Sequence, residues 1–190
     1  MAIVARSGEQ LTARGWTIGS NPVPYRLEYR LWAGDRFVTE RLLVAAEGGG
    51  WTRTIDLRRS PEGDWSCLAS SEGAPDLPQG GGDLSPLQGA DDCDLGRSPV
   101  TNVMPVLRHD MHRGGEPVDF RMAWVSVPDL AVSVSRQRYS FVRRTDGGSI
   151  VRYESVDSGF TADLELDPDG FVVRYPGLAE RLAPLPSAAF

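Results

Sequence analysis

The sequence predicts an all-β protein in which a single large antiparallel sheet is curled into a roll or barrel-like architecture, with very little helix. Apolar and polar residues alternate with a period of two through much of the chain, which is typical of strands with one buried face. Clusters of Gly, Pro, Asn and Asp separate these stretches. No window carries the i, i+3, i+4, i+7 apolar spacing of an amphipathic helix over several turns.

The first predicted strands form a meander. In the first strand Tyr25, Leu27, Tyr29 and Leu31 alternate with charged residues, which gives it one apolar face. A run of β-forming residues follows, and three consecutive glycines at 48–50 then reverse the chain. The four strands are expected at residues 25–31, 37–46, 51–58 and 65–68.

The segment 70–89 differs in composition. It is rich in Gly, Pro, Ser and Asp and has few large apolar residues. Such a composition is typical of loops. We therefore expect one β-roll domain over residues 1–190, interrupted by a mobile loop at about 70–89 that gates a cavity if the roll encloses one.

The second half of the chain repeats the meander pattern. Its clearest feature is the turn Asp167-Pro168-Asp169-Gly170, where Pro presets φ and Gly accepts a positive φ. One short turn is expected at 177–182. The strands are expected at residues 118–127, 131–144, 149–156, 160–166 and 171–175. About ten strands favour closure into a roll, because an open sheet leaves unpaired edges and an unburied apolar face.

Composition and charge exclude several classes of function. The 190 residues are 41% hydrophobic and 24% charged, as in a globular protein. The net charge of −6 argues against a nucleic-acid partner. All twenty basic residues other than the two His are Arg, so no Schiff-base or P-loop lysine is present. We expect neither a cofactor nor a metal.

The chain shows no targeting or membrane-spanning pattern. Cys67 and Cys93 are too few for a disulfide scaffold or a four-thiolate zinc site. The N-terminal segment contains Arg6, Glu9 and Arg14 and lacks the apolar region of a secretory signal. No stretch reaches the ~18 apolar residues of a membrane span. These observations predict a cytoplasmic protein without an integral membrane segment.

The richest polar motif lies between Asp91 and Arg108, before a strand expected to begin near Val103. It reads Asp-Cys-Asp-Leu-Gly-x-Ser-Pro-x-Thr-Asn-x-x-Pro-x-x-Arg from residue 92 to residue 108. This order resembles the central signature of the bacterial family described as "putative glycolipid-binding". Other blocks, at 25–29, 123–130, 138–139, 153–155 and 169–178, are similar to further parts of that family, so the resemblance covers about residues 25–181.

The resemblance implies a single spiral β-roll and non-catalytic binding of a small amphiphilic ligand. It transfers no catalytic residue. From the chemistry of a sugar or phosphate headgroup we expect planar and hydroxyl groups at the mouth of an apolar cavity. The candidate ligand-binding residues are Asp94, Thr101, Asn102, Arg108 and Trp124. Turn capping and local pairing are the structural alternative for these polar residues.

Two other functions are considered. A hydrolase would use His109 and His112 with nearby carboxylates, although residues three apart on a strand face opposite sides. A protein-interaction module would present an apolar edge strand to a partner. Whether the interior of the roll is packed solid or holds a ligand is left open by the sequence.

Overall fold

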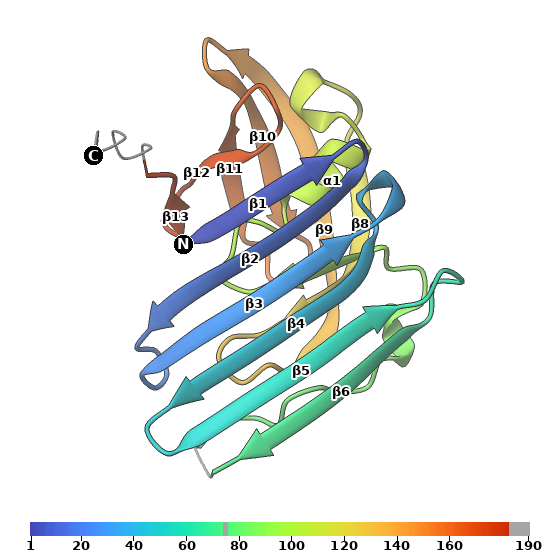
Figure 1. Ribbon diagram of the computed structural model, residues 1–190. Coiled ribbons are helices and arrows are strands. Elements are labelled where there is room, and N and C mark those ends of the chain that lie inside the picture. Colours follow the sequence, from blue (N-terminus) through green and yellow to red (C-terminus); the bar gives the residue numbers. More distant parts are fainter. Residues whose placement is uncertain (74–75, 183–190) are drawn as a thin grey trace, which may run out of the picture.

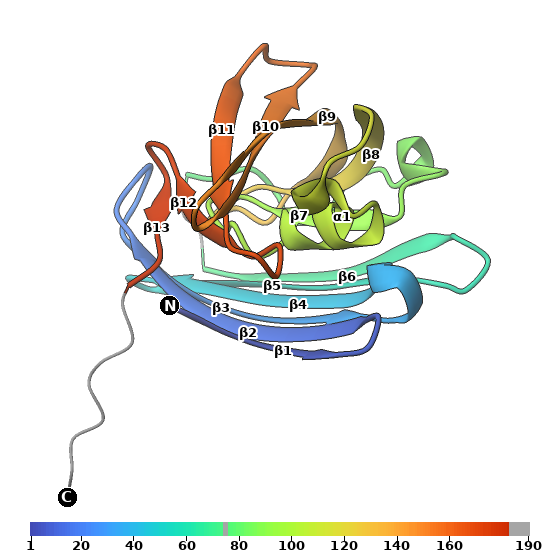
Figure 2. The same ribbon diagram turned by 90° about the horizontal axis from the view of Figure 1, so that it is seen from above.

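The computed structural model describes residues 1–73 and 76–182, whose strands form two sheets (Figure 1). The first has the strand order β1-β2-β3-β4-β5-β6 and the second the order β13-β12-β11-β10-β9-β8-β7. Seen from above, the first sheet is curved and the second stands over its concave face (Figure 2). The all-β class and the scarcity of helix are confirmed. The expectation of one continuous sheet is corrected to two.

Each strand of the first sheet pairs antiparallel with the next strand along the chain. The N-terminal hairpin β1–β2 was not predicted. The inward-facing positions of β2 include Ala13 and Gly15, and such small residues give little alternation in hydrophobicity along the sequence. The strands are β1 (Ala2–Ser7), β2 (Gln10–Gly19), β3 (Tyr25–Ala33), β4 (Thr39–Gly48), β5 (Trp51–Arg59) and β6 (Trp65–Glu72).

The second sheet is antiparallel except at one end, where β7 runs parallel to β8. The predicted turn at Asp167 is confirmed, since Asp167 N donates to Phe171 O at 2.9 Å and Gly170 has a φ of 85°. Residues 177–182 contain the short strand β13. The strands are β7 (Asp92–Leu95), β8 (Val118–Val125), β9 (Val132–Thr145), β10 (Gly148–Ser155), β11 (Thr161–Leu166), β12 (Val172–Tyr175) and β13 (Ala179–Glu180).

The strand expected near Val103 is wrong, because Val103–Arg108 forms the helix α1. Val103 to Leu107 are all buried, so the segment shows no amphipathic period from which a helix could be recognised. The described ranges also contain three single-turn 3₁₀ helices: η1 (Asp35–Phe37), η2 (Ser85–Leu87) and η3 (Met111–Arg113). No helix among the described residues is long and apolar enough to cross a bilayer.

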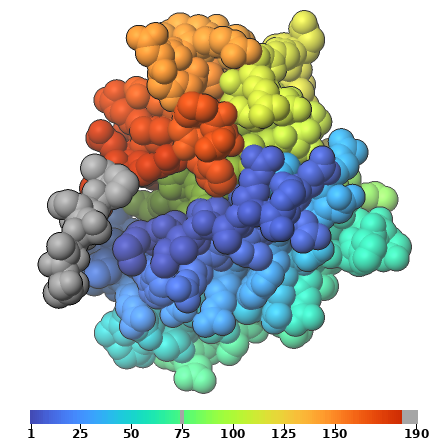
Figure 3. Space-filling view, turned by 45° about the horizontal axis from the view of Figure 1, so that its top comes forward, coloured from blue at the N-terminus to red at the C-terminus, as the bar shows by residue number. Residues whose placement is uncertain are grey.

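Helix α1 lies between the two sheets and contributes to both hydrophobic clusters. Val103, Met104 and Leu107 belong to the larger cluster on the concave face of the first sheet. Val106 belongs to the second cluster, which includes Tyr139 and the inner side chains of β10 and β11. Figure 3 shows a hollow between the N-terminal strands (blue) and the C-terminal strands (red), at whose bottom atoms from the middle of the chain are seen.

The segment that follows β6 crosses the molecule to the second sheet. Strand β6 continues to Glu72, beyond the predicted end at Leu68. Gly81 forms a parallel bridge with Ala131, and the Leu87 side chain is fully buried. The described part of the segment 70–89 is therefore attached at these two places. Its mobility stays a prediction, and residues 74–75 lie outside the described part of the chain.

Candidate functional site

The central motif contains a buried ion pair. Arg108, in the last turn of α1, donates from Nη1 to Asp92 Oδ1 at 2.8 Å and from Nη2 to Asp92 Oδ2. The two side chains are only 4% and 1% exposed. Burial raises the pKa of the Asp92 carboxyl, and the guanidinium of Arg108 opposes that shift. This pair joins the helix to β7.

The next acidic residue of the motif, Asp94, is the centre of a second polar network. Thr101 Oγ1 donates to Asp94 Oδ1 at 2.8 Å, and Gln137 Nε2 donates to Asp94 Oδ2 at 2.7 Å. Asn102 Nδ2 donates to Tyr139 Oη at 2.7 Å, and that hydroxyl in turn donates to Gln137 Oε1 at 3.3 Å. The network therefore links the motif to β9.

Burial controls the protonation of this network. It raises the pKa of the Asp94 carboxyl, and the hydrogen bonds from Gln137 and Thr101 oppose the shift. Burial, together with the charge of Asp94, raises the pKa of Tyr139 well above its usual value. Every one of these side chains already has a protein partner, so the network satisfies its own buried polar groups.

A third contact joins the motif to the first sheet. Cys93 N donates to Thr39 Oγ1 at 3.0 Å, and Thr39 N donates to Asp91 O at the same distance. Cys93 is fully buried, and burial raises the pKa of its thiol to about 12. The motif is thus bonded to β4, β9 and α1 at once.

The five predicted ligand-binding residues fall into three groups. Asp94, Thr101 and Asn102 meet in the network around Gln137, whereas Arg108 is paired with Asp92. Trp124 lies beside Asp94 in the β7–β8 register and is 37% exposed. The structure gives the four polar residues partners within the chain, and their role as ligand-binding residues stays a prediction.

The two histidines differ in their surroundings. His109 is exposed and packs edge-on against the ring of Phe120, with 5.2 Å between ring centroids. His112 is buried against Gly170, and neither of its ring nitrogens has a hydrogen-bond partner in the described part of the chain. No group of three or more His, Cys, Asp or Glu side chains suited to a metal ion is found among the described residues.

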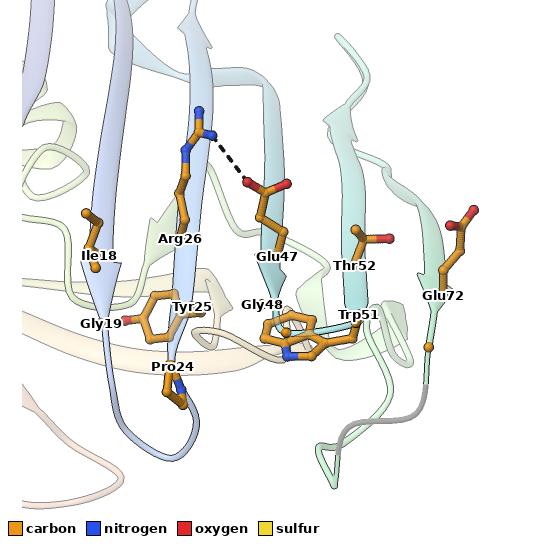
Figure 4. Close-up of a pocket in the computed structure, with 13 residues that line it drawn as sticks. Ile18, Gly19, Pro24, Tyr25, Arg26, Glu47, Gly48, Trp51, Thr52 and Glu72 are labelled. Atoms are coloured by element: carbon orange, nitrogen blue, oxygen red, sulfur yellow. Dashed lines mark hydrogen bonds and ion pairs between the residues drawn. The ribbon is translucent and has the colours of Figure 1, made fainter.

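A trough of about 700 Å³ lies at one end of the first sheet (Figure 4). One row of its lining residues crosses neighbouring strands and alternates glycine with aromatic residues. The row was not recognised in the sequence, because its members come from separate strands and only their antiparallel register brings them together. In spatial order it consists of Gly19, Tyr25, Gly48, Trp51 and Gly73.

The glycines of this row allow the aromatic rings to lie across the sheet. A Cβ atom on Gly19 would come within 2.3 Å of the Tyr25 ring, and one on Gly48 within 2.3 Å of Trp51 Nε1. The same arrangement recurs two rows deeper, where a Cβ on Gly15 would come within 2.5 Å of the Tyr29 ring. Glycine is therefore required here by the closeness of the rings.

The rim of the trough is polar and charged. Arg26 Nη1 donates to Glu47 Oε1 at 3.2 Å, and Thr52 and Glu72 continue the same cross-strand row. Ile18, at the other end of that row, is 86% exposed. Figure 4 shows the Arg26–Glu47 pair further along the strands from the rings of Tyr25 and Trp51. The rings and the rim residues occupy alternate positions on these strands and therefore point to opposite faces of the sheet, which the trough joins at the strand ends.

Two polar atoms of the aromatic residues remain available. Within the described part of the chain, neither Trp51 Nε1 nor Tyr25 Oη makes a hydrogen bond, and neither is among its buried polar atoms that lack a partner. By contrast, Trp65 Nε1 donates to Ala90 O at 3.0 Å. The trough therefore presents an indole N–H and a phenol O–H beside its charged rim.

A smaller groove of about 360 Å³ lies on the same strands, next to the trough. Its accessible surface is mostly apolar and includes Leu43, Ala45 and Leu68. Leu68 is 74% exposed and belongs to β6, the edge strand of the first sheet. An exposed edge of this kind is what a protein-interaction module requires, and that alternative stays a prediction.

Comparison with known proteins agrees with this architecture. The family model described as "Putative glycolipid-binding" matches residues 1–181. No curated protein matches the chain. The crystal structure at 1.80 Å resolution of a DUF1089 family protein from Pseudomonas aeruginosa is similar, with a TM-score of 0.72 and 26% sequence identity over 96% of this chain and 91% of that chain.

Proposed function

This chain belongs to the family described as "Putative glycolipid-binding", and from that premise we propose that it binds an amphiphilic ligand without catalysing a reaction. The polar head of the ligand occupies the trough at the ends of β2 to β6. The observation that carries the proposal is the pair of available donors, Trp51 Nε1–H and Tyr25 Oη–H, in a trough of about 700 Å³.

The chemistry of the trough is that of a site for a hydroxylated headgroup. Aromatic side chains with polar tips provide an apolar surface and a hydrogen-bond donor together. The carboxylates of Glu47 and Glu72 accept hydrogen bonds from hydroxyl groups, and Arg26 and Thr52 donate to them. The volume falls within the range of roughly 300–1,000 Å³ that is usual for small-molecule sites.

The apolar part of the ligand lies along the neighbouring groove. Leu43, Ala45 and Leu68 are on the outer face of the sheet with the rim residues, so the ligand passes round the end of the sheet from the rings to the groove. Consecutive residues on one face of a strand are about 6.6 Å apart, so a short alkyl chain reaches from the rim to the groove. Burial of this chain contributes about 25 cal/mol for each Å² of apolar surface.

The test compares two matched tryptophan substitutions with dodecyl maltoside as the probe, below its micelle concentration. Trp51→Phe keeps an aromatic ring in the trough but removes the indole N–H. Trp32→Phe makes the same change on β3, at the end of the strand opposite to Tyr25. We expect calorimetry to show an affinity about fivefold weaker for Trp51→Phe, because one neutral hydrogen bond is lost, and an unchanged affinity for Trp32→Phe.

Failure of the wild-type protein to bind dodecyl maltoside would contradict the proposal, as would an equal effect of the two substitutions. Native mass spectrometry of protein purified from its own host lysate provides a second measurement. A co-purifying amphiphile is the expected result. If this amphiphile no longer co-purifies with the Trp51→Phe variant but still co-purifies with Trp32→Phe, the result would link it to the trough.

A further inference from the structure

The inner face of the first sheet carries a buried cation that has no counter-ion among the described residues. Arg53 lies on β5, between Ala46 of β4 and Ser71 of β6, and is 3% exposed. Among the described residues no carboxylate lies within ion-pair distance of its guanidinium. Ala74 and Pro75, the internal residues outside the described ranges, have uncharged side chains.

The hydrogen bonds of Arg53 are incomplete. Nη1 donates to Ser71 Oγ at 2.9 Å and Nη2 donates to Leu77 O at 3.2 Å, while Nε has no partner in the described part of the chain. Both acceptors are neutral. A buried charge is costly unless it is paired, and an unmatched guanidinium therefore destabilises the folded state.

Two other arginines in this protein each bind both oxygens of a carboxylate. The side chain of Arg108 is also buried, and it donates hydrogen bonds to both carboxylate oxygens of Asp92. Arg41 uses Nε and Nη2 to hold both carboxylate oxygens of Asp56, at 2.8 and 2.9 Å. On the corresponding side of the Arg53 guanidinium, the Nε–Nη2 edge, Nε–H has no acceptor among the described residues and Nη2 donates only to the carbonyl of Leu77. This edge has the geometry that binds two oxygens of a carboxylate or phosphate.

Arg53 lies directly behind the trough. It is the next residue after Trp51 on the inner face of β5, and Ser71 is the next residue before Gly73 on that face, so about 6.6 Å of strand separates them from the trough. The carbonyl that covers Arg53 belongs to Leu77, which is partly exposed and precedes three consecutive glycines at 80–82. Displacement of this carbonyl would leave Nη2 free to donate to another acceptor.

We propose that Arg53 is the anchor for an anionic group on the ligand, so that the ligand is an anionic amphiphile bearing a phosphate or a carboxylate. Two oxygens of this group bind the Nε–Nη2 edge and replace the carbonyl of Leu77. The inference rests on the proposed function of the trough, because the trough is the route by which the headgroup reaches Arg53.

The first test measures binding of four probes by calorimetry: dodecyl phosphate, dodecanoate, dodecyl maltoside and inorganic phosphate. We expect the wild-type protein to bind at least one of the two anionic dodecyl compounds about tenfold more tightly than dodecyl maltoside, because a charged hydrogen-bonded pair is gained. Which anion binds more tightly distinguishes a phosphate from a carboxylate headgroup. Arg53→Met should abolish this preference, so that the anionic compounds bind no more tightly than dodecyl maltoside.

Arg152→Met is the matched control. Arg152 forms an exposed ion pair with Asp163 on the second sheet, and its replacement should leave all four affinities unchanged. The Nε–H resonance of Arg53 in the wild-type protein gives a second readout that requires no folded variant. It should move when dodecyl phosphate or dodecanoate is added, and stay in place with dodecyl maltoside.

The outcomes separate the two proposals. Binding of dodecyl maltoside without any preference for the anionic compounds overturns the role of Arg53 and leaves the function of the trough intact. An absence of binding by all three dodecyl compounds overturns the proposed function itself. If inorganic phosphate moves the Arg53 resonance as much as dodecyl phosphate and binds as tightly, the site takes a free anion, and the assignment of an amphiphile is overturned.

Discussion

The indole ring of Trp51 lies over the backbone of Gly48, so closely that a Cβ atom on this glycine would be 2.3 Å from Nε1. The contact determines where the ring lies in the trough and therefore where its N–H points. A Cβ atom on Gly49, the next residue, would have no atom of another segment within 4 Å. The two glycines differ in what a methyl group would meet, which makes them a matched pair.

Gly48→Ala is expected to displace the Trp51 ring, to weaken binding of dodecyl maltoside, and to lower the free energy of unfolding by roughly 1–3 kcal/mol through overpacking. Gly49→Ala should change neither quantity by a measurable amount. Calorimetric titration and urea unfolding of both variants provide the check. Equal affinities for the two variants would show that the ring position does not matter for binding.

The buried pair Asp92–Arg108 should dominate the stability of the central motif. Arg108→Met leaves an uncompensated carboxylate in the interior and should cost about 3–5 kcal/mol. The double variant Asp92→Leu/Arg108→Met should recover most of that loss, because both charges are then absent. Chemical denaturation measures each value. The exposed Arg152→Met control should cost far less, because solvent screens its ion pair; an equally small loss for Arg108→Met would refute the buried-pair argument.

His112 should make stability depend on pH. Burial, followed by the charge of Arg113, lowers its pKa below the usual value. As pH falls below the unfolded pKa of about 6.5, the unfolded chain binds a proton that the folded protein does not. The free energy of unfolding therefore decreases from pH 7 to pH 5, and His112→Leu should reduce this decrease. Unfolding curves at the two pH values test the assignment, and His109→Leu measures the separate share of His109, whose pKa burial also lowers; identical slopes in wild type and His112→Leu would exclude the role of His112.

The two thiols should differ in reactivity. Cys93 is fully buried with a pKa of about 12, whereas Cys67 is partly exposed, although burial raises its pKa as well. We expect the thiol reagent 5,5′-dithiobis(2-nitrobenzoic acid) at pH 8 to modify Cys67 slowly in the folded protein and Cys93 only after denaturation. Cys67→Ala should then show no reaction while folded. Rapid modification of that variant would mean that the interior around Thr39 opens readily.

Much of the β architecture was predictable because strand alternation is a local property. Tyr25, Leu27, Tyr29 and Leu31 do face inward on β3, and the Asp167 turn does join β11 to β12. Helix α1 was missed for a physical reason, since it is buried on all sides between the sheets. The N-terminal hairpin was missed because small residues occupy inward positions of β2.

The candidate site was harder to predict than the fold. The polar residues of the central motif predict a ligand site. In the structure these residues, namely Asp92, Thr101, Asn102 and Arg108, make hydrogen bonds within the chain. The trough depends on single residues of separate strands, most of them glycines that resemble ordinary turn residues in the sequence. Arg53 looks like one more charged residue in a strand until its burial is known.

The sequence by itself determined the class of the fold, the positions of most of its strands, the absence of lysine chemistry and the family resemblance. These follow from composition and from side-chain alternation along a continuous segment. The tertiary structure alone decided the division into two sheets, the partner of Arg108, the lack of a counter-ion for Arg53 among the described residues and the row from Gly19 to Gly73. These depend on which strands pair and in what register, and contacts between distant segments arise only when the chain buries its apolar faces together.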